Sequence, residues 1–390
     1  MNICFYHHHG INPLTGGIKR MTAALGDELA SHGHKVVYLG RESDANDVFD
    51  KTRQYFLSAL EGNSKDAVLE NFLKNQRIDV FVFQDGDDGE IFSAEIFSRL
   101  GIPIVCCVHN DPMLWKNLVY AKILRRPCGR VFSIAFPWFI ALKTFLKGRK
   151  YIRIFRKNSR TADATVLLSE RFVPEYSRLI SAADKRKISA FPNPIPFFPQ
   201  QTELSTKRRE LLFVGRMDNR QKCMDFLLAA WAKLETRFPD WRLRFVGDGR
   251  GLSPLRALSE KLKLRRVFFE GRQSPEPYYR DASIFCMTSA FEGFPMVLLE
   301  AAAFGCVPVA FDSFAAVRDI IDDGENGALV PAFDLDAYAE TLARLMSDDA
   351  LRERLAENAL AQIPEKFSPE KIGAQWEALF RKLLAEKGRE

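Results

Sequence analysis

The sequence lacks several features that mark specialised classes of protein. None of its seven cysteines forms a Cys-x-x-Cys pair, which argues against a zinc site. It contains no short internal repeat and no low-complexity tract. With 47% hydrophobic and 27% charged residues, its composition is that of an ordinary globular protein. Disordered, collagen-like and small disulfide-stapled proteins are therefore excluded.

The sequence also has no hydrophobic run of membrane-spanning length. The first ten residues, MNICFYHHHG, lack the basic region and apolar run of a signal peptide, and we expect them to open the fold as a strand. The apolar run at residues 131–142 is shorter than the ~20 residues that a spanning helix needs, and Pro137 interrupts it. Most cysteines lie in apolar, strand-like runs, so we expect free thiols and a reducing compartment.

The excess of positive charge is small but unevenly distributed. The chain has 56 Lys and Arg against 50 Asp and Glu, a net charge of +6, which is too weak for a dedicated nucleic-acid-binding protein. Residues 111–160 contain thirteen basic residues and one acidic residue, Asp111. This segment therefore carries +12, and the rest of the chain sums to −6.

Short apolar runs alternate with helical patterns along the chain, which predicts βαβ units and parallel sheets. Four prolines fall within residues 191–199, where neither a helix nor a central strand can form, so we predict an interdomain linker there. The predicted strands are 2–7, 35–39, 78–83, 102–108 and 164–168 before the linker, and 211–214, 242–246, 266–269, 284–287 and 307–310 after it. The predicted helices include 17–32, 64–76, 222–236, 253–262, 295–304, 336–347 and 368–388.

This pattern predicts an α/β protein with two doubly wound, Rossmann-like domains. The first covers residues 1–195 and includes a basic, aromatic insertion at 111–160. The second covers 196–366, and we expect the C-terminal helix in 367–390 to pack back toward the first domain. Ligands of such sheets bind at the carboxyl ends of the strands, so we expect the active site in the cleft between two facing domains.

Two glutamates eight residues apart carry the strongest functional signal. Pro295 suits the first position of a helix, which places Glu292 in the preceding loop and Glu300 on the helix. The backbone N–H groups of Met296 and Val297 then lie in the first turn, where they attract phosphate. The glutamates on either side of this anion site suit hydroxyl groups that flank a diphosphate. An ordinary helix with a solvated glutamate at each end is the alternative interpretation.

The residues around this pair resemble a known family. Glu292-Gly293-Phe294, Glu300-Ala301, Gly305 and Pro308-Val309 follow the pattern of retaining glycosyltransferases of the GT4 type, which have the two-domain GT-B fold. The resemblance covers most of 200–345 and is weaker over 1–195. Further matching stretches are Phe191–Pro194, Phe213–Arg216 followed by Lys222, Phe245–Gly249, and Asp322–Gly327 followed by Leu329-Val330.

The resemblance implies roles for residues of the second domain. Arg216 and Lys222 would contact the diphosphate of a nucleotide sugar and stabilise the negative charge that builds on the leaving nucleotide. They would replace a divalent metal, so we expect no metal and no cofactor; Asp85-Gly86-Asp87 is a weak exception to the absence of a metal motif. Glu300 would accept hydrogen bonds from the ribose.

Glu292 would lie beside the donor sugar, and residues Phe294, Pro295, Met296 and Val297 would line the donor and its diphosphate. Two retaining mechanisms remain open for Glu292. It is either the nucleophile of a double displacement or a positioning group in a same-face attack on an oxocarbenium-like ion pair.

Two places in the first domain also match the family. Gly16 and Gly17 follow the first strand and open a helix, where glycine lets backbone N–H groups approach a phosphate. A plain strand-to-helix turn is the alternative. His109 ends a strand and looks like the family's active-site histidine near the donor sugar; a loop histidine with internal partners is the alternative. Residues 7–9 are consecutive histidines that point to alternate faces of a strand, which argues against a metal site.

Two positions depart from known patterns. Cys223 follows Lys222 where the family usually has glycine, which leaves Lys222 in place but puts the shape of this loop in question. Gly247-Asp248-Gly249 suggests a dinucleotide fingerprint, but Leu252 occupies the place of its third glycine, which argues against a nicotinamide cofactor.

The basic insertion suggests a membrane partner. A basic segment with Trp and Phe can lie in the headgroup region of a bilayer. We therefore expect it to dock on an anionic membrane face where a lipid-linked acceptor is presented. A helical hairpin that covers the sheet and an RNA-binding segment are the alternatives. The residues expected to face the membrane are Arg125, Arg126, Trp138, Lys147, Arg149 and Lys150.

Together these features predict a metal-independent, retaining glycosyltransferase. It would move a hexose or N-acetylhexosamine from a nucleotide sugar, expected to be a UDP-sugar, to a lipid-linked saccharide, a lipopolysaccharide or another surface polysaccharide. We expect it in the cytoplasm, peripheral on the inner face of the cell membrane, with no nucleic-acid partner. A sugar-nucleotide epimerase on the same fold and a non-catalytic, membrane-bound sugar-binding protein are the alternatives.

Overall fold

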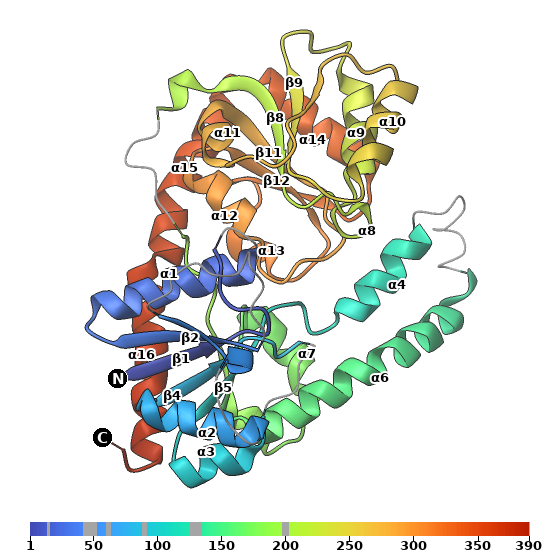
Figure 1. Ribbon diagram of the computed structural model, residues 1–390. Coiled ribbons are helices and arrows are strands. Elements are labelled where there is room, and N and C mark those ends of the chain that lie inside the picture. Colours follow the sequence, from blue (N-terminus) through green and yellow to red (C-terminus); the bar gives the residue numbers. More distant parts are fainter. Residues whose placement is uncertain are drawn as a thin grey trace. The chain divides into compact units, whose positions relative to one another are not determined.

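The computed structural model describes residues 1–13, 16–41, 53–59, 64–87, 92–124, 135–196 and 203–389. The chain divides into two compact units, which are shown in Figure 1. Each unit is built on one sheet, and a site shared between the two domains stays a prediction. Unit 1 comprises Met1–Met113, Lys147–Pro196 and Phe367–Glu390, and unit 2 comprises Leu114–Leu146 and Phe197–Lys366.

Unit 1 contains a parallel sheet with the strand order β3-β2-β1-β4-β5-β6-β7. The central strands are apolar along their whole length and buried, because helices cover both faces of the sheet. The strands are β1 (Asn2–Tyr6), β2 (Lys35–Gly40), β3 (Gln54–Phe56), β4 (Val80–Phe83), β5 (Ile104–Val108), β6 (Ala164–Leu167) and β7 (Ile188–Ala190).

Successive residues of β1 enter different cores, because side chains of a strand alternate between the two faces. Phe5 packs in a cluster with Trp376 of the C-terminal helix, and Tyr6 packs with Phe72 and Phe97. The C-terminal helix lies against the first helix, within unit 1. The helices of this unit are α1 (Gly17–Ser31), α2 (Lys65–Asn75), α3 (Ala94–Leu100), α7 (Val173–Ser177) and α16 (Pro369–Glu386).

Unit 2 contains a second parallel sheet, with the order β10-β9-β8-β11-β12-β13. In chain order this is 3-2-1-4-5-6, the arrangement of the Rossmann fold. Its strands are β8 (Arg208–Val214), β9 (Arg242–Val246), β10 (Val267–Phe269), β11 (Ala282–Met287), β12 (Val307–Asp312) and β13 (Ala328–Pro331).

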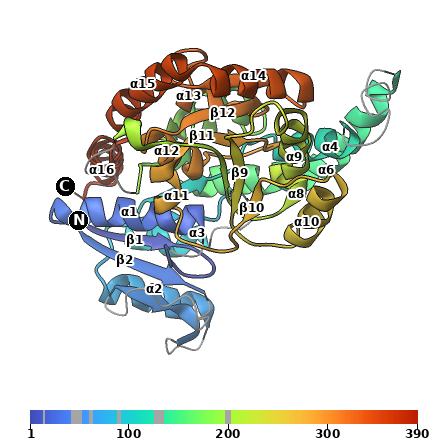
Figure 2. The ribbon, with the colours of Figure 1, turned by 90° about the horizontal axis from the view of Figure 1, so that it is seen from above.

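Helices cover the sheet of unit 2 as well, with Trp231 and Tyr338 fully buried in one of its apolar clusters. Figure 2 shows α14 and α15 running along one side of this sheet. The helices are α8 (Asn219–Lys222), α9 (Met224–Leu234), α10 (Leu252–Lys261), α11 (Glu276–Asp281), α12 (Met296–Ala303), α13 (Val317–Ile320), α14 (Leu335–Ser347) and α15 (Asp349–Phe367).

The basic segment forms two helices, α4 (Leu114–Leu124) and α6 (Pro137–Thr161). It was predicted as an insertion of the first domain, whereas residues 114–146 group with unit 2. The reason is that Leu114 and Leu118 of α4 pack against an apolar cluster with Cys223 and Phe291. Within the described ranges, no helix combines the length and apolar character needed to cross a bilayer.

All ten predicted strands correspond to strands of the two sheets. The prediction omitted β3, β7 and β13, which have only three or four residues each, and it omitted α15. The cysteines within the described ranges are buried and form no disulfide bond, and burial alone raises the pKa of the Cys4 thiol. Buried thiols of this kind act as small apolar side chains.

Candidate donor-binding site

The centre of the unit 2 sheet brings together residues that are far apart in the sequence. β8 and β11 are neighbours, but the chain leaves β8 toward β9 on one side and leaves β11 toward β12 on the other. Such a switch point at the carboxyl ends of the strands forms a crevice for ligands. Arg216 and Lys222 follow β8, and Glu292 follows β11, so all three lie at this point.

An ion pair joins the two loops. Lys222 Nζ lies 2.6 Å from Glu292 Oε1, and the two side chains are only 13% and 10% exposed. Gln221 Nε2 donates to Glu292 Oε2 at 3.1 Å, and Gln221 Oε1 accepts from Arg216 Nη2 at 3.3 Å. Because the pair is largely shielded from water, its attraction exceeds that of a surface ion pair. The predicted residues Arg216, Lys222 and Glu292 therefore form one network, with Gln221 as its centre.

The local backbone explains how Lys222 reaches Glu292. The Asp218 carboxylate accepts the Arg220 N–H at 3.1 Å and caps the short helix α8. Cys223 then ends α8 in the left-handed conformation, with φ 49° and ψ 40°. Glycine takes this conformation most easily, so Cys223 keeps the loop shape that a glycine would give. The departure at this position therefore does not displace Lys222.

Two further hydrogen bonds tie α8 to the loop after β11. Ala290 N donates to Gln221 O at 2.7 Å, and Thr288 Oγ1 donates to Lys222 O at 3.0 Å. The two segments that carry the ion pair are thus also joined through the backbone carbonyl groups of Gln221 and Lys222.

Close packing of two loops accounts for the glycines near residue 247. Gly247 has a φ of 139°, and a Cβ there would lie 1.9 Å from Gly215 O. Met217 N also donates to Asp248 O at 2.8 Å, which joins the loops after β8 and β9. These glycines let one loop support another, which explains the pattern without a dinucleotide.

Helix α12 begins one residue later than predicted, with Pro295 as its N-cap residue rather than its first helical residue. Its first internal hydrogen bond runs from Leu298 N to Pro295 O at 2.9 Å. The N–H groups of Met296 and Val297 precede this bond and lie in the first turn, where a helix favours anions. Phe294 and Met296 are almost fully buried beside them.

Glu300 is fully buried on α12. Its Oε2 accepts from Tyr279 Oη at 3.0 Å, so part of the cost of burying the carboxylate is offset by a hydrogen bond. Its predicted contact with a ribose stays a prediction.

The strand ends of unit 1 hold the second group of predicted residues. His109 follows β5, is 5% exposed, and its Nε2 lies 2.5 Å from Oε1 of Gln84, which follows β4. Burial, and secondarily the nearby His7, lowers the pKa of His109 to about 3. The ring is therefore neutral near pH 7. Among the described residues, His109 Nδ1 has no hydrogen-bond partner.

The Asp85-Gly86-Asp87 stretch serves the backbone of unit 1. Asp87 Oδ2 accepts from His109 N at 2.9 Å, and Asp85 Oδ2 accepts from His8 N at 2.7 Å. Both carboxylates therefore hold neighbouring strand ends together. In the part of the chain that the structure describes, no cluster of three or more His, Cys, Asp or Glu is suited to a metal ion.

Gly16 is the N-cap residue of α1, and Gly17 is the first residue of that helix. An added Cβ at Gly16 would meet no heavy atom within 4 Å, so internal packing does not require glycine there. Thr15 lies outside the described residues. The predicted phosphate contact of this loop stays a prediction.

The residues predicted to face a membrane divide into two groups. Arg125 and Arg126 lie outside the described residues, while Trp138, Arg149 and Lys150 are exposed on α6. Lys147 is exposed on α6 as well, and the membrane contact of all these residues stays a prediction.

Sequence reasoning missed two glutamines that hold the predicted residues. Gln221 bonds Glu292, and Gln84 bonds His109. Their positions were the only available signal, since Gln221 directly precedes Lys222 and Gln84 directly follows a predicted strand.

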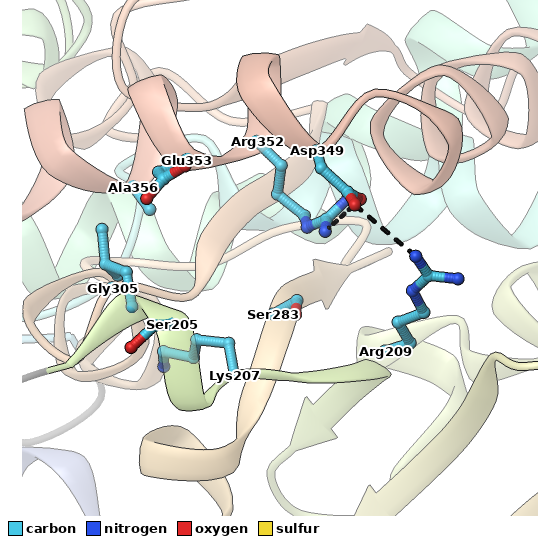
Figure 3. Close-up of a pocket in the computed structure, with 10 residues that line it drawn as sticks. Ser205, Lys207, Arg209, Ser283, Gly305, Asp349, Arg352, Glu353 and Ala356 are labelled. Carbon is cyan, nitrogen blue, oxygen red and sulfur yellow. Dashed lines mark hydrogen bonds and ion pairs between the residues drawn. The ribbon is translucent and has the colours of Figure 1, made fainter.

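A cavity of about 240 Å³ lies in unit 2 beside the amino ends of β8 and β11, away from the loops that carry Lys222 and Glu292. Figure 3 shows three of its charged side chains directed at one another: Asp349 pairs with both Arg209 and Arg352. Lys207 donates to Tyr279 O at 2.7 Å. Its cations are thus engaged by protein groups, and the cavity is unrelated to the predicted site.

Known proteins match both the sequence and the fold. Residues 194–362 match the family model of glycosyl transferases group 1. An uncharacterized glycosyltransferase of Haemophilus influenzae is 24% identical over 93% of this chain and 96% of its own. An N-acetylgalactosaminyltransferase of Campylobacter jejuni, named for an undecaprenol-linked saccharide, is 25% identical over 82% of this chain and 77% of its own.

An exopolysaccharide phosphotransferase of Streptomyces coelicolor is 34% identical over 58% of this chain, but the chain spans only 24% of that protein. Among solved structures, HepE of Anabaena in complex with UDP and glucose has a TM-score of 0.73 and 16% identity, and covers 98% of this chain and 100% of its own. This likeness shows the fold, which is GT-B. The chain is therefore a glycosyltransferase, and its residues 194–362 match the glycosyl transferases group 1 family.

Proposed function

We propose that the protein transfers a hexose or N-acetylhexosamine from a UDP-sugar to a lipid-linked or surface saccharide, with retention of configuration and without a metal ion. The network of Arg216, Gln221, Lys222 and Glu292 carries this proposal, because it joins two cations to the loop that leads into α12. Such a cluster suits a diphosphate. UDP is bound in the solved structure of HepE, which supports a UDP-sugar as the donor.

Lys222 has a defined task in this proposal. Without a donor, its ammonium group is held by Glu292 at 2.6 Å. A diphosphate offers stronger negative charge, and that charge grows as the glycosidic bond breaks, so Lys222 and Arg216 stabilise the transition state more than the ground state. Charge neutralisation by these two side chains takes the place of a metal ion.

Glu292 acts on the sugar in this proposal. Gln221 holds one carboxylate oxygen, which fixes the plane of the carboxylate while Lys222 turns toward the phosphates. The other oxygen then accepts from a sugar hydroxyl near the reacting carbon. Glu300 supports the ribose, and His109 lies on the sugar side as a neutral ring that exchanges no charge with the substrate.

The acceptor is proposed from chemistry outside the donor site. The Campylobacter relative is named for an undecaprenol-linked acceptor, and the basic segment at 111–160 suits an anionic membrane face. We place the protein peripherally on the inner face of the cell membrane, where such an acceptor is presented.

Release of UDP from a panel of UDP-sugars, with and without a chelator, tests the donor and the metal. We expect one UDP-sugar to support release equally in both conditions. Strict dependence on a divalent ion would falsify the metal-independent mechanism. Product analysis without acceptor separates transfer from epimerisation, since an epimerase converts the nucleotide sugar itself.

A further inference from the structure

Most of the exposed large hydrophobic side chains in the described part of the chain lie at the start of α6. Seven large hydrophobic side chains are exposed in the described part of the chain, and five of them lie within residues 136–146. Trp138 is 65% exposed and Phe145 is 62% exposed. The five are Phe136, Trp138, Leu142, Phe145 and Leu146. An exposed apolar group of this kind marks an interaction surface.

Four of these side chains share one side of α6, and Phe136 directly precedes the helix. Trp138, Leu142, Phe145 and Leu146 follow the i, i+4, i+7, i+8 spacing of a single helical face. Ile140, half a turn away from Trp138, is 2% exposed. The outer face of the helix is therefore apolar over two turns, and its inner face packs against protein.

The same face becomes basic further along the helix. Arg149, Arg153, Arg156 and Arg160 continue the spacing that begins at Trp138, and all four are exposed. Helix α6 contains no Asp or Glu. One continuous stripe thus changes from apolar to cationic. Its apolar part suits the acyl region of a bilayer, and its cationic part suits the phosphate headgroups.

The second half of α6 is fixed in unit 1. Ile154 and Phe155 are buried, and the Phe155 ring packs against Tyr176 with centroids 5.3 Å apart. Asn158 Nδ2 also donates to Gly86 O at 3.3 Å, within the loop that supports His109. Helix α6 is unbroken from Pro137 to Thr161 and is shown in green in Figure 1.

We propose that the outer face of α6 is a docking surface for an anionic lipid bilayer, with Trp138 and Phe145 in the headgroup–acyl boundary and the arginines on lipid phosphates. This deepens the proposed function, on which it rests for the presence of a lipid-linked acceptor. A second copy of this chain is a poor occupant, because two such cationic faces repel each other. The combination of exposed Trp and Phe with charge of one sign matches lipid.

Tryptophan emission reports this docking directly. The other four tryptophans are Trp115, Trp231, Trp241 and Trp376, and none is more than 3% exposed. Vesicles that contain phosphatidylglycerol should shift the emission of Trp138 to shorter wavelength, and brominated lipid should quench it. Neutral phosphatidylcholine vesicles should leave the emission unchanged. Binding without a shift would show that another surface meets the lipid and would overturn the assignment.

Vesicle flotation of the full chain measures the contribution of the face. The double variant Trp138→Ser, Phe145→Ser should partition at least tenfold less onto phosphatidylglycerol vesicles, and added salt should weaken binding of the wild type. Leu262→Ser is the matched control, since Leu262 is 37% exposed on another part of the chain, and it should bind as the wild type does. Equal binding of the double variant and the wild type, equal binding to neutral vesicles, or no binding at all would overturn the proposal.

UDP release in solution separates the two proposals. The double variant should release UDP without vesicles at the wild-type rate, which also shows that it folds. If the wild type binds anionic vesicles but releases no UDP, the proposed function fails and the docking surface stands. If UDP release is normal and vesicle binding is absent, the docking surface fails alone.

Discussion

The side chains that follow the strands differ in charge between the two units. In unit 2, Lys222 and Glu292 are charged and neutralise each other at 2.6 Å. In unit 1, His109 is kept neutral by burial and is held by the uncharged amide of Gln84. Charged side chains suit an anionic ligand such as a diphosphate, whereas a neutral side chain suits hydroxyl groups. The same fold thus offers two kinds of chemistry, according to the residues that follow its strands.

Substitution of a charged residue in unit 2 should have the largest effect on the rate of UDP release. Lys222→Ala removes a cation aimed at the leaving group, and we expect UDP release to fall about 10²- to 10³-fold. Arg220→Ala is the control, because Arg220 lies on the same short helix but is exposed and pairs with Asp218. Steady-state rates of UDP release measure both variants. A fall of less than about threefold for Lys222→Ala would show that the diphosphate lies elsewhere.

Nucleotide affinity should be the next most sensitive quantity. Glu300→Gln keeps the shape of the side chain but removes its charge, so we expect UDP to bind roughly 10- to 100-fold more weakly, as for a hydrogen bond to a charged group. Titration calorimetry with UDP measures the change, with Glu276→Gln as the control, because the Glu276 side chain of α11 is exposed. Unchanged affinity for UDP would refute the ribose role of Glu300.

The neutral side of the comparison should appear in the pH dependence of stability. The pKa of His109 is lowered to about 3 in the folded protein, against about 6.5 for an unperturbed histidine. The unfolded chain therefore binds a proton that the folded chain excludes, and stability is lost as the pH falls from 6.5 toward 3. Between pH 7 and pH 5 this amounts to about 2 kcal/mol.

His109→Gln should remove that part of the pH dependence. Denaturant unfolding at pH 7 and pH 5 gives the two free energies of unfolding for each protein. The wild type should lose about 2 kcal/mol more than the variant over this range. Parallel losses in the two proteins would show that His109 titrates normally in the fold.

The loop at Cys223 should respond least. Cys223→Gly relieves a left-handed residue but removes a buried side chain, and the two effects of about 1 kcal/mol each largely cancel. Cys223→Ala removes the thiol without the relief and should destabilise by about 1 kcal/mol. Thermal unfolding compares the variants. A Gly variant less stable than the Ala variant would contradict the importance of the backbone conformation.

The fold could be predicted well because its strands are marked by local sequence patterns. Buried parallel strands are apolar throughout, so each of ten predicted strands was visible as a short apolar run. The three missed strands, β3, β7 and β13, have three or four residues each and leave too little pattern to recognise.

The charged residues of the candidate site could be predicted from the sequence, whereas the residues that hold them in place could not. Arg216, Lys222 and Glu292 lie in recognisable motifs, and the structure brings them together. Gln221 and Gln84 belong to no motif, because their role depends on which side chain faces them across two loops.

The sequence by itself determined the two-domain α/β class, the family resemblance and the concentration of positive charge in residues 111–160. These properties depend on composition and on spacing along the chain. Only the tertiary structure decided that Lys222 pairs with Glu292, that burial keeps His109 neutral, and that an apolar stripe on α6 continues into arginines. The reason is physical: pairing, desolvation and exposure depend on distances between residues that are remote in sequence.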